Sequence, residues 1–104
     1  MSNNTKVYEE PSETTYTIYT KPGCPNCVKA KKLLEKEKVI IIDCEEYLID
    51  DKESFLKFIQ EKAKQPPNQE IKTFPMIFYK NQWIGGYSEL IPFYDTEKAF
   101  DFLN

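Results

Sequence analysis

Two cysteines separated by two residues are the part of this sequence best suited to chemistry. Cys24 and Cys27 enclose Pro25 and Asn26, and on a helix residues three positions apart lie one turn from each other on one face. At that spacing the two thiols can close into a disulfide and open again. The pair stands between a strand-like run at 15–20 and a predicted helix, which favours a redox pair over a zinc site.

Two strands and an intervening helix are predicted around this cysteine pair. Residues 15–20 predict the first strand, and the helix after the pair has Val28, Leu33 and Leu34 as its buried stripe. The β-branched run at 39–42 predicts a parallel strand that is covered on both faces.

The second half of the chain predicts a helix, a hairpin and a final helix. Asp50 or Asp51 caps the first of these helices, in which apolar residues recur at helical spacing. A hairpin follows over residues 76–84, with Asn81-Gln82 as its two-residue link. A short segment at 88–94 then precedes the last helix, which we expect to begin at about Thr96.

The element order β-α-β-α-β-β-α predicts the fold class. A right-handed parallel βαβ unit followed by a hairpin gives an α/β fold, with a mixed four-stranded sheet and helices on both faces. Residues 1–14 are polar and lack a strong period, so we expect a flexible N-terminal lead-in. The domain itself is expected to span residues 15–104.

Composition limits the classes of function. At 104 residues the chain holds one domain, and 40% hydrophobic with 30% charged residues is globular composition. A net charge of −3 argues against nucleic-acid binding. The absence of histidine excludes histidine acid–base catalysis and histidine-containing zinc sites, so no metal is expected. Three cysteines, no visible signal peptide and no membrane span predict a reducing, cytoplasmic location.

Lysines are concentrated on the helix that follows the cysteine pair. Five lysines stand at positions 29, 31, 32, 36 and 38. A solvated helix face accounts for such a run, and the alternative is that its positive field attracts an anionic thiol substrate.

Three segments of the sequence together resemble the signatures of the glutaredoxin family. They are Thr-Lys-Pro-Gly-Cys-Pro-Asn-Cys at 20–27, Thr-Phe-Pro at 73–75 and Gly-Gly-Tyr-Ser-Glu-Leu at 85–90. The resemblance implies a thioredoxin-like fold and a monomeric, glutathione-dependent thiol–disulfide oxidoreductase. Such an enzyme reduces glutathione mixed disulfides and protein disulfides, with glutathione as co-substrate.

The resemblance assigns the two cysteines different roles, and helix physics supplies reasons. Cys24 is the expected nucleophile, because the positive end of the helix dipole and Lys21 both stabilise its thiolate. A lower pKa also makes this sulfur a better leaving group when a mixed disulfide is resolved. Cys27, one turn inside the helix, is the expected resolving thiol, and exchange with glutathione can proceed with Cys24 alone.

The other two signatures imply a glutathione site. Pro75 resembles the cis-proline of the family, with the Phe74 backbone free to pair with an extended substrate. Gly86, Tyr87 and Ser88 resemble the turn that holds the γ-glutamyl end, and N–H groups at a helix start accept a carboxylate. Lys21 is expected at the glycyl carboxylate, with Lys72 and Gln60 as further candidates.

Several alternatives stay open at this stage. Asn26 replaces the aromatic residue of many dithiol members, which leaves the redox potential open and keeps a second function in view: a dimeric carrier of a [2Fe–2S] cluster held by Cys24 and glutathione thiols. Cys44 is either a packed thiol or a regulatory, glutathionylated one. Trp83 and the tyrosines are interpreted as packing residues.

The resemblance also bears on partners and origin. Ribonucleotide reductase is one protein substrate that the family suggests. Viral members share a similar Gly-Gly-Tyr-Ser turn, so a large DNA virus is a conceivable source, with the protein in the host cytoplasm or the virion.

Overall fold

The computed structural model describes residues 7–103 and contains the predicted elements in the predicted order. They are β1 (Tyr16–Thr20), α1 (Pro25–Leu33), β2 (Val39–Asp43), α2 (Glu45–Ala63), β3 (Met76–Tyr79), β4 (Gln82–Gly85) and α3 (Tyr87–Leu103). Within this described range no helix is both long enough and apolar enough to cross a membrane.

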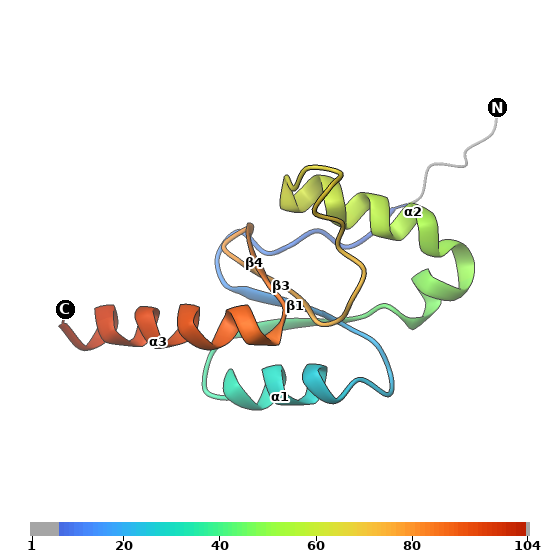
Figure 1. Ribbon diagram of the computed structural model, residues 1–104. Coiled ribbons are helices and arrows are strands. Elements are labelled where there is room, and N and C mark those ends of the chain that lie inside the picture. Colours follow the sequence, from blue (N-terminus) through green and yellow to red (C-terminus); the bar gives the residue numbers. More distant parts are fainter. Residues whose placement is uncertain (1–6, 104) are drawn as a thin grey trace.

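The four strands form one mixed sheet with the order β2-β1-β3-β4. β1 pairs in parallel with β2 and antiparallel with β3, and β3 pairs antiparallel with β4. Helices α1 and α3 lie on one face of the sheet and α2 lies on the other (Figure 1). The predicted α/β class, with helices on both faces, is confirmed. Since β1 and β2 are parallel, their carboxyl ends meet at one edge of the sheet, where α1 and α2 begin.

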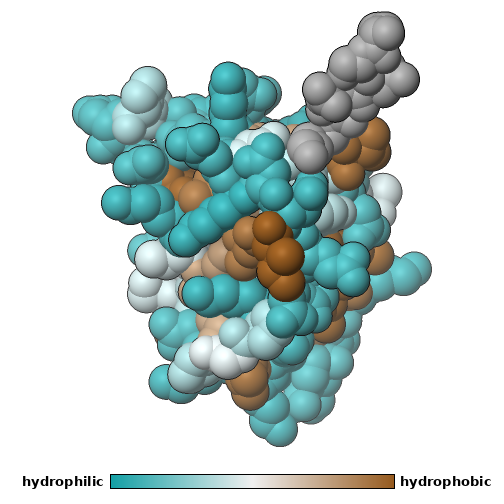
Figure 2. Space-filling model, turned by 90° about the vertical axis from the view of Figure 1, so that its right-hand side faces the viewer, coloured by the Kyte–Doolittle hydropathy of each residue, from teal (hydrophilic) through white to brown (hydrophobic). Residues whose placement is uncertain are grey.

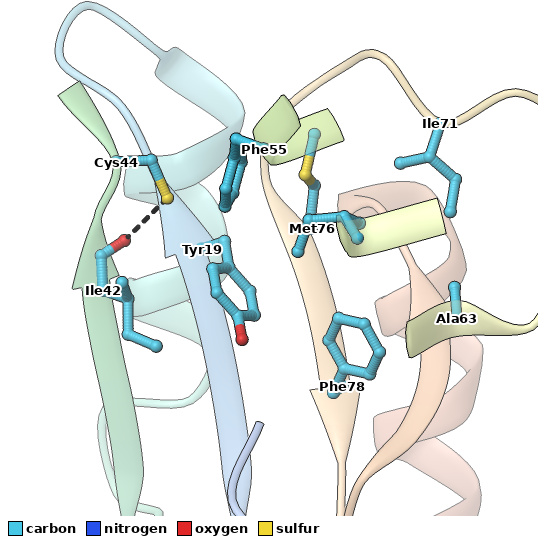
Figure 3. Close-up of a cluster of buried hydrophobic side chains, with 9 residues drawn as sticks. Tyr19, Ile42, Cys44, Phe55, Ala63, Ile71, Met76 and Phe78 are labelled. Carbon is cyan, nitrogen blue, oxygen red and sulfur yellow. Dashed lines mark hydrogen bonds between the residues drawn. The ribbon is translucent and has the colours of Figure 1, made fainter. Parts of the chain in front are cut away.

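Alternation along β1 divides the core into two layers. Tyr16 and Ile18 face a cluster with Ala30, Leu34 and other residues beneath α1 and α3. The opposite face supports a second cluster beneath α2 (Figure 3). Its fully or nearly fully buried members are Tyr19, Ile42, Cys44, Phe55, Ile59, Ala63, Ile71, Met76 and Phe78. This second layer fixes the strand ends that carry the site.

Strand β2 is less covered than its sequence predicts. Ile40 and Ile41 are 42% and 51% exposed, and Ile42 is buried. The reason is topological: β3 occupies the other side of β1, which leaves β2 at the edge of the sheet. The prediction of a strand covered on both faces is therefore wrong.

Helix α2 contains a kink and begins earlier than its sequence predicts. Asp51 has extended backbone angles (φ −160°, ψ 84°), and its Oδ1 accepts a hydrogen bond from the Ser54 N–H at 3.1 Å. Asp51 is thus the N-cap of the second part of the helix, as one of the two sequence alternatives held. The preceding helical turns, Glu45–Asp50, were not predicted. Asp43 Oδ1 accepts from the Glu45 N–H at 2.9 Å at their start.

Helix α3 is continuous where two segments were expected. Pro92 lies inside it, and a proline removes one hydrogen bond without necessarily ending a helix. Further along, the Tyr94 hydroxyl donates to Glu37 Oε2 at 2.8 Å, and Lys98 Nζ lies 3.2 Å from the same oxygen. Because Glu37 follows α1, these contacts hold α3 against the end of that helix.

The link between β3 and β4 is a two-residue turn without glycine. Lys80 and Asn81 have positive φ angles of 50° and 66°. Two consecutive left-handed residues are typical of a type I′ turn, whose twist matches that of a hairpin. The predicted hairpin is confirmed, but its link lies one residue earlier than Asn81-Gln82, because Gln82 already belongs to β4.

Residues 8–10 of the expected lead-in contact helix α2. The Tyr8 ring lies 4.9 Å from that of Tyr47 and 5.1 Å from that of Phe58. The Tyr19 hydroxyl donates to the Glu9 carbonyl at 2.6 Å. An aromatic cluster thus anchors this part of the lead-in to the domain, and its expected flexibility stays a prediction. Residues 1–6 lie outside the described residues.

Candidate active site

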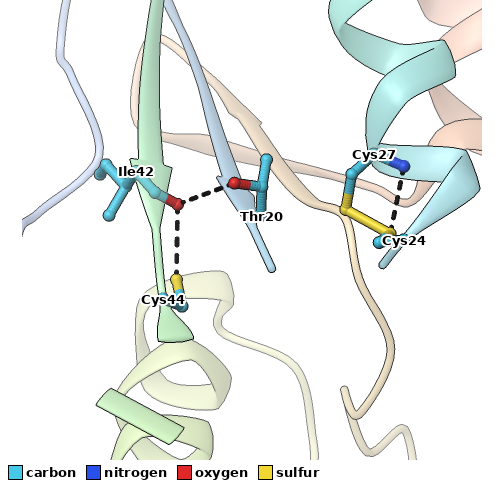
Figure 4. Close-up of a disulfide and its surroundings, with 5 residues drawn as sticks. All are labelled: Thr20, Cys24, Cys27, Ile42 and Cys44. Carbon is cyan, nitrogen blue, oxygen red and sulfur yellow. Dashed lines mark hydrogen bonds between the residues drawn. A yellow bond between two sulfur atoms is a disulfide. The ribbon is translucent and has the colours of Figure 1, made fainter. Parts of the chain in front are cut away.

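The cysteine pair lies at the start of α1 and is joined as a disulfide (Figure 4). The two Cα atoms are 5.2 Å apart. Cys24 is the N-cap, with extended backbone angles, and its Sγ accepts a hydrogen bond from the Cys27 N–H at 3.1 Å. Cys24 is partly exposed, but Cys27 is only 1% exposed. An external reagent can therefore reach the first sulfur, and the second is sheltered inside the helix.

The electrostatic setting of Cys24 is positive. The first turn of α1 has no acidic residue, and its free N–H groups face the N-cap. Lys21 lines the same hollow as Cys24, and its Nζ lies 5.6 Å from the centroid of the Phe74 ring. Lys72 lines that hollow as well. Both lysines thus line the hollow in which a carboxylate was expected.

Two adjoining hollows, of about 350 and 440 Å³, lie beside the disulfide, and we name the two together the cleft. The smaller hollow contains Cys24, and the larger contains Trp83. Their shared wall consists of Asn26, Lys72, Thr73 and Phe74. The remaining predicted ligand residues, Pro75, Gly86, Tyr87 and Ser88, line the larger hollow. The structure therefore brings to this cleft every predicted glutathione-site residue except Gln60.

The wall between the hollows is fixed from beneath. The bond between Phe74 and Pro75 is cis, as the resemblance implied. Pro75 is buried, and the Phe74 ring stacks on Phe55 with centroids 6.4 Å apart and planes within 6° of parallel. Phe55 belongs to the α2 layer of the core. The packing of the core thus positions the backbone that faces Cys24.

The far end of the cleft is the N-terminus of α3. Glu89 Oε1 accepts a hydrogen bond from the Gly86 N–H at 2.8 Å, which is the backward half of a capping box. Gly85 has φ +130°, and a Cβ there would lie 2.9 Å from the Glu89 side chain. In the first turn, the Tyr87 and Ser88 N–H groups have no intrahelical acceptor, because a helix leaves its first donors free. This end can accept a carboxylate.

Gln60 does not reach the cleft as a free ligand. Its Nε2 donates to the carbonyls of Gln65, Pro66 and Gln69 at 3.0–3.1 Å, and its Oε1 accepts from the Ile71 N–H at 2.9 Å. One half-buried amide thus organises the loop that precedes Lys72. Gln60 was predicted as a candidate at the glycyl carboxylate, but its amide instead holds this loop in place. No sequence motif indicated that role.

Sequence reasoning missed two further contributors to the cleft. Glu89 shapes the turn before α3, and the capping-box spacing was the signal that could have identified it. Trp83 packs edge-on against Phe78 with centroids 5.2 Å apart, as expected of a packing residue, and it also lines the larger hollow.

Cys44 lies at the end of β2, apart from the cleft. It is fully buried, and its Sγ donates to the Ile42 carbonyl at 3.6 Å (Figure 4). Burial, with a smaller contribution from the Asp43 charge, raises the pKa of its thiol to about 12. A regulatory role needs an accessible or ionisable thiol, so these properties favour the packed alternative. Within residues 7–103, no three Cys, Asp or Glu side chains are grouped as a metal site would require.

Comparison with known proteins identifies relatives of one kind. The glutaredoxin family model matches residues 16–84. Glutaredoxin 1 of Rickettsia bellii is 37% identical over 81 residues, covering 78% of this chain and 74% of the relative. Glutaredoxin 1 of Escherichia coli is 35% identical over 74 residues, covering 69% and 82%. The crystal structure of glutaredoxin 1 from Francisella tularensis, complexed with cacodylate, superposes with a TM-score of 0.64 at 28% identity, covering 81% and 95%.

Proposed function

The chain belongs to the glutaredoxin family of thiol–disulfide oxidoreductases, and from this premise we propose that it uses glutathione to reduce glutathione mixed disulfides and protein disulfides. The observation that carries the proposal is the charge pattern of the cleft. Lys21 stands at one end, the N-terminus of α3 stands at the other, and Lys72 lies in the wall that the two hollows share. Glutathione has a carboxylate at each end and a thiol between them, and Cys24 opens onto the same cleft.

In the first half-reaction, Cys24 is the nucleophile and the other residues of the cleft stabilise or position the reacting groups. The Cys24 thiolate attacks the glutathione sulfur of a mixed disulfide, forms a Cys24–glutathione disulfide and releases the substrate thiolate, which takes a proton from solvent. Lys21 and the free N–H groups of α1 stabilise the attacking thiolate. The Gly86–Ser88 turn and the lysines hold the two carboxylates, so that the glutathione sulfur is presented to Cys24.

Two routes complete the cycle. In the first, a glutathione thiolate attacks the bound glutathione sulfur, which yields glutathione disulfide and restores the Cys24 thiolate. In the second, Cys24 opens a protein disulfide and the Cys27 thiolate attacks the Cys24 sulfur, which frees the second substrate thiol. The resulting Cys24–Cys27 disulfide is the state of the structure, and two glutathione molecules reduce it. Each route moves two electrons. A reducing compartment such as the cytoplasm would supply the glutathione.

A glutathione-coupled assay tests the cysteine roles. We expect Cys24→Ser to reduce turnover of a glutathione mixed disulfide to the background rate, because no nucleophile remains. Cys27→Ser should retain this exchange and lose reduction of a protein disulfide. Cys44→Ala serves as the matched cysteine control and should retain both. Equal loss in the Cys24 and Cys27 variants would contradict the division of roles.

A second assay tests glutathione recognition itself. Lys21→Gln should raise the KM for the glutathione mixed disulfide about two- to fivefold, the effect expected of one solvent-exposed ion pair. Lys57→Gln, on α2, is the control and should leave KM unchanged. The cluster-carrier alternative is judged on the wild-type protein purified anaerobically. A brown dimer with negligible turnover would overturn the enzymatic proposal.

A further inference from the structure

Helix α1 exposes an apolar residue one turn from the reactive cysteine. The sequence predicts Val28 in the buried stripe, but the buried residues of α1 are Cys27 and Ala30, and Val28 is 62% exposed. The outer side of the helix, which we name the α1 face, consists of Pro25, Val28, Lys29 and Lys32 at spacing i, i+3, i+4 and i+7. All four are exposed. Proline and valine at such positions gain nothing from intramolecular packing.

The α1 face is strongly basic in a chain of net charge −3. Residues 25–38 contain five lysines and two glutamates. Glu37 contacts Tyr94 and Lys98 on α3. Glu35 Oε1 lies 3.4 Å from Lys32 Nζ. Within residues 7–103, Lys29 forms no ion pair. The face therefore combines a small apolar centre with one lysine, Lys29, whose charge no ion pair compensates, and a second, Lys32, whose ion pair is exposed.

The position of this face relative to the cleft suggests what it contacts. A glutathionylated protein has two parts, and only the glutathione part fits the cleft beside Phe74 and Pro75. When Cys24 attacks the glutathione sulfur, the departing sulfur and its polypeptide lie outside that cleft. The α1 face begins at Pro25, which lines the hollow around Cys24. The surface at the end of the molecule where α1 and α2 begin is mainly hydrophilic, with hydrophobic residues in separate patches (Figure 2).

We propose that the α1 face docks the polypeptide part of the substrate and selects segments in which acidic residues accompany an apolar side chain near the modified cysteine. This inference rests on the proposed glutathione-dependent function and specifies its substrate class. The apolar side chain covers Val28, and the acidic residues approach Lys29 and Lys32. Charge complementarity of this kind raises the association rate and is weakened by salt. The chemical step is unchanged: Cys24 and glutathione form a disulfide, and the substrate leaves as a thiolate that is then protonated.

Two synthetic peptides of equal length provide the test. Each carries one glutathionylated cysteine next to a leucine, and the flanking residues are glutamates in one peptide and glutamines in the other. We expect the wild-type protein to deglutathionylate the acidic peptide with a kcat/KM about tenfold higher at low salt, and with little difference at high salt. The Lys29→Glu/Lys32→Glu variant should lose this preference. Lys57→Glu, on the opposite side of the sheet, should keep it.

A small substrate separates docking from chemistry. The cysteine–glutathione mixed disulfide has no polypeptide to dock, so the α1-face variants should reduce it at the wild-type rate. A parallel loss on this substrate would overturn the proposal, because the lysines would then act on the Cys24 thiolate. Equal rates for the two peptides with wild-type protein would overturn it as well. Failure of the wild-type protein to reduce the small substrate would contradict the proposed function instead.

Binding can be followed without turnover. The acidic peptide with serine in place of its cysteine should shift the amide NMR signals of Val28 and Lys29, and the glutamine peptide should not. Val28→Ser should weaken this binding, while Val28→Ile, which keeps the apolar surface, should preserve it. Unchanged α1 signals would overturn the docking role even if glutathione-dependent turnover is present.

Discussion

Two cysteines cap helices at the same edge of the sheet. Cys24 follows β1 and is the N-cap of α1, and Cys44 follows the parallel strand β2 and is the N-cap of α2 (Figure 4). By position in the fold, both sulfurs could use free helix N–H groups. Only the Cys24 sulfur does, since it accepts from the Cys27 N–H, and the Cys44 side chain forms no cap hydrogen bond.

Backbone conformation and burial account for the difference. Cys24 is extended (φ −117°, ψ 100°), which turns its sulfur toward the first turn of α1 and toward solvent. Cys44 (φ −101°, ψ 10°) directs its sulfur into the core, against Phe55 and Tyr19 (Figure 3). Asp43 supplies the cap acceptor for α2 in its place. A helix N-terminus therefore activates a thiol only when the sulfur faces both the free N–H groups and water.

The largest expected difference between Cys24 and Cys44 is in their rates of alkylation in the native, reduced protein. At pH 7, a thiol with a pKa of about 12 is ionised to about one part in 10⁵, whereas an ordinary thiol is ionised to about 3%. We expect Cys44 to react with iodoacetamide at least about a thousandfold more slowly than Cys24. Peptide mass spectrometry gives both rates. Unfolding in guanidinium is the control, because it should make the two sulfurs equally reactive. Similar rates in the native protein would restore the regulatory role of Cys44.

The comparison also shows what the sequence could predict. The helix-start position of the cysteine pair could be read from local signals, whereas the cis-proline segment and the role of the Gly-Gly turn were predicted only through the resemblance to the glutaredoxin family. The sequence placed these runs on the correct elements, and the fold brings them to one cleft. The capping signal of Asp51 was likewise local, and its hydrogen bond to Ser54 is present.

The features that sequence reasoning missed depend on distant contacts. Val28 was assigned to the core because it is apolar, yet the orientation of α1 is set by Cys27 and Ala30. Exposure of Ile41 depends on β3 pairing with β1, and an apolar run does not reveal the sheet order. The fate of Cys44 depends on its neighbours in the α2 layer. Tertiary packing, which no local pattern encodes, decided each case.

The second prediction concerns stability. Cys44→Ala removes a fully buried sulfur and its contact with the Ile42 carbonyl, so it should lower the free energy of unfolding by about 1–2 kcal/mol. Cys24→Ala, measured in reducing buffer, removes a partly exposed side chain and should change it by less than about 0.5 kcal/mol. Urea unfolding at neutral pH supplies both values. If Cys44→Ala left the free energy of unfolding unchanged, the packing role of Cys44 would be contradicted. Activity should show the reverse: Cys24→Ala should abolish it and Cys44→Ala should retain it.

The third prediction concerns alkaline pH. The folded-state pKa of Cys44 is raised to about 12, so the unfolded chain ionises first. Its contribution to stability is therefore complete below the ordinary thiol pKa and is lost as pH rises from there toward the folded value. At about pH 10 the wild type should have lost about 2 kcal/mol more than Cys44→Ala, relative to neutral pH. Using the variant as reference cancels most of the shared titration of lysines and tyrosines. A constant difference between the two proteins across this range would show that the thiol is not held neutral by the fold.

The smallest effect separates the two causes of the Cys44 shift. Burial is the larger cause and the Asp43 charge is the next. Asp43→Asn removes that charge while its side-chain oxygen can still accept from the Glu45 N–H. We expect native alkylation of Cys44 to accelerate only about two- to fivefold, as for the loss of one charge near the surface. Asp51→Asn, at the kink in α2, is the matched control and should leave the rate unchanged. Acceleration to the rate of Cys24 would mean that charge controls the inert thiol, and the contrast between the two helix caps would then be electrostatic. A change of only two- to fivefold would assign the contrast between the two caps to the direction of the sulfur. Burial of the Cys44 sulfur would then account for most of its low reactivity, and the Asp43 charge for a small part.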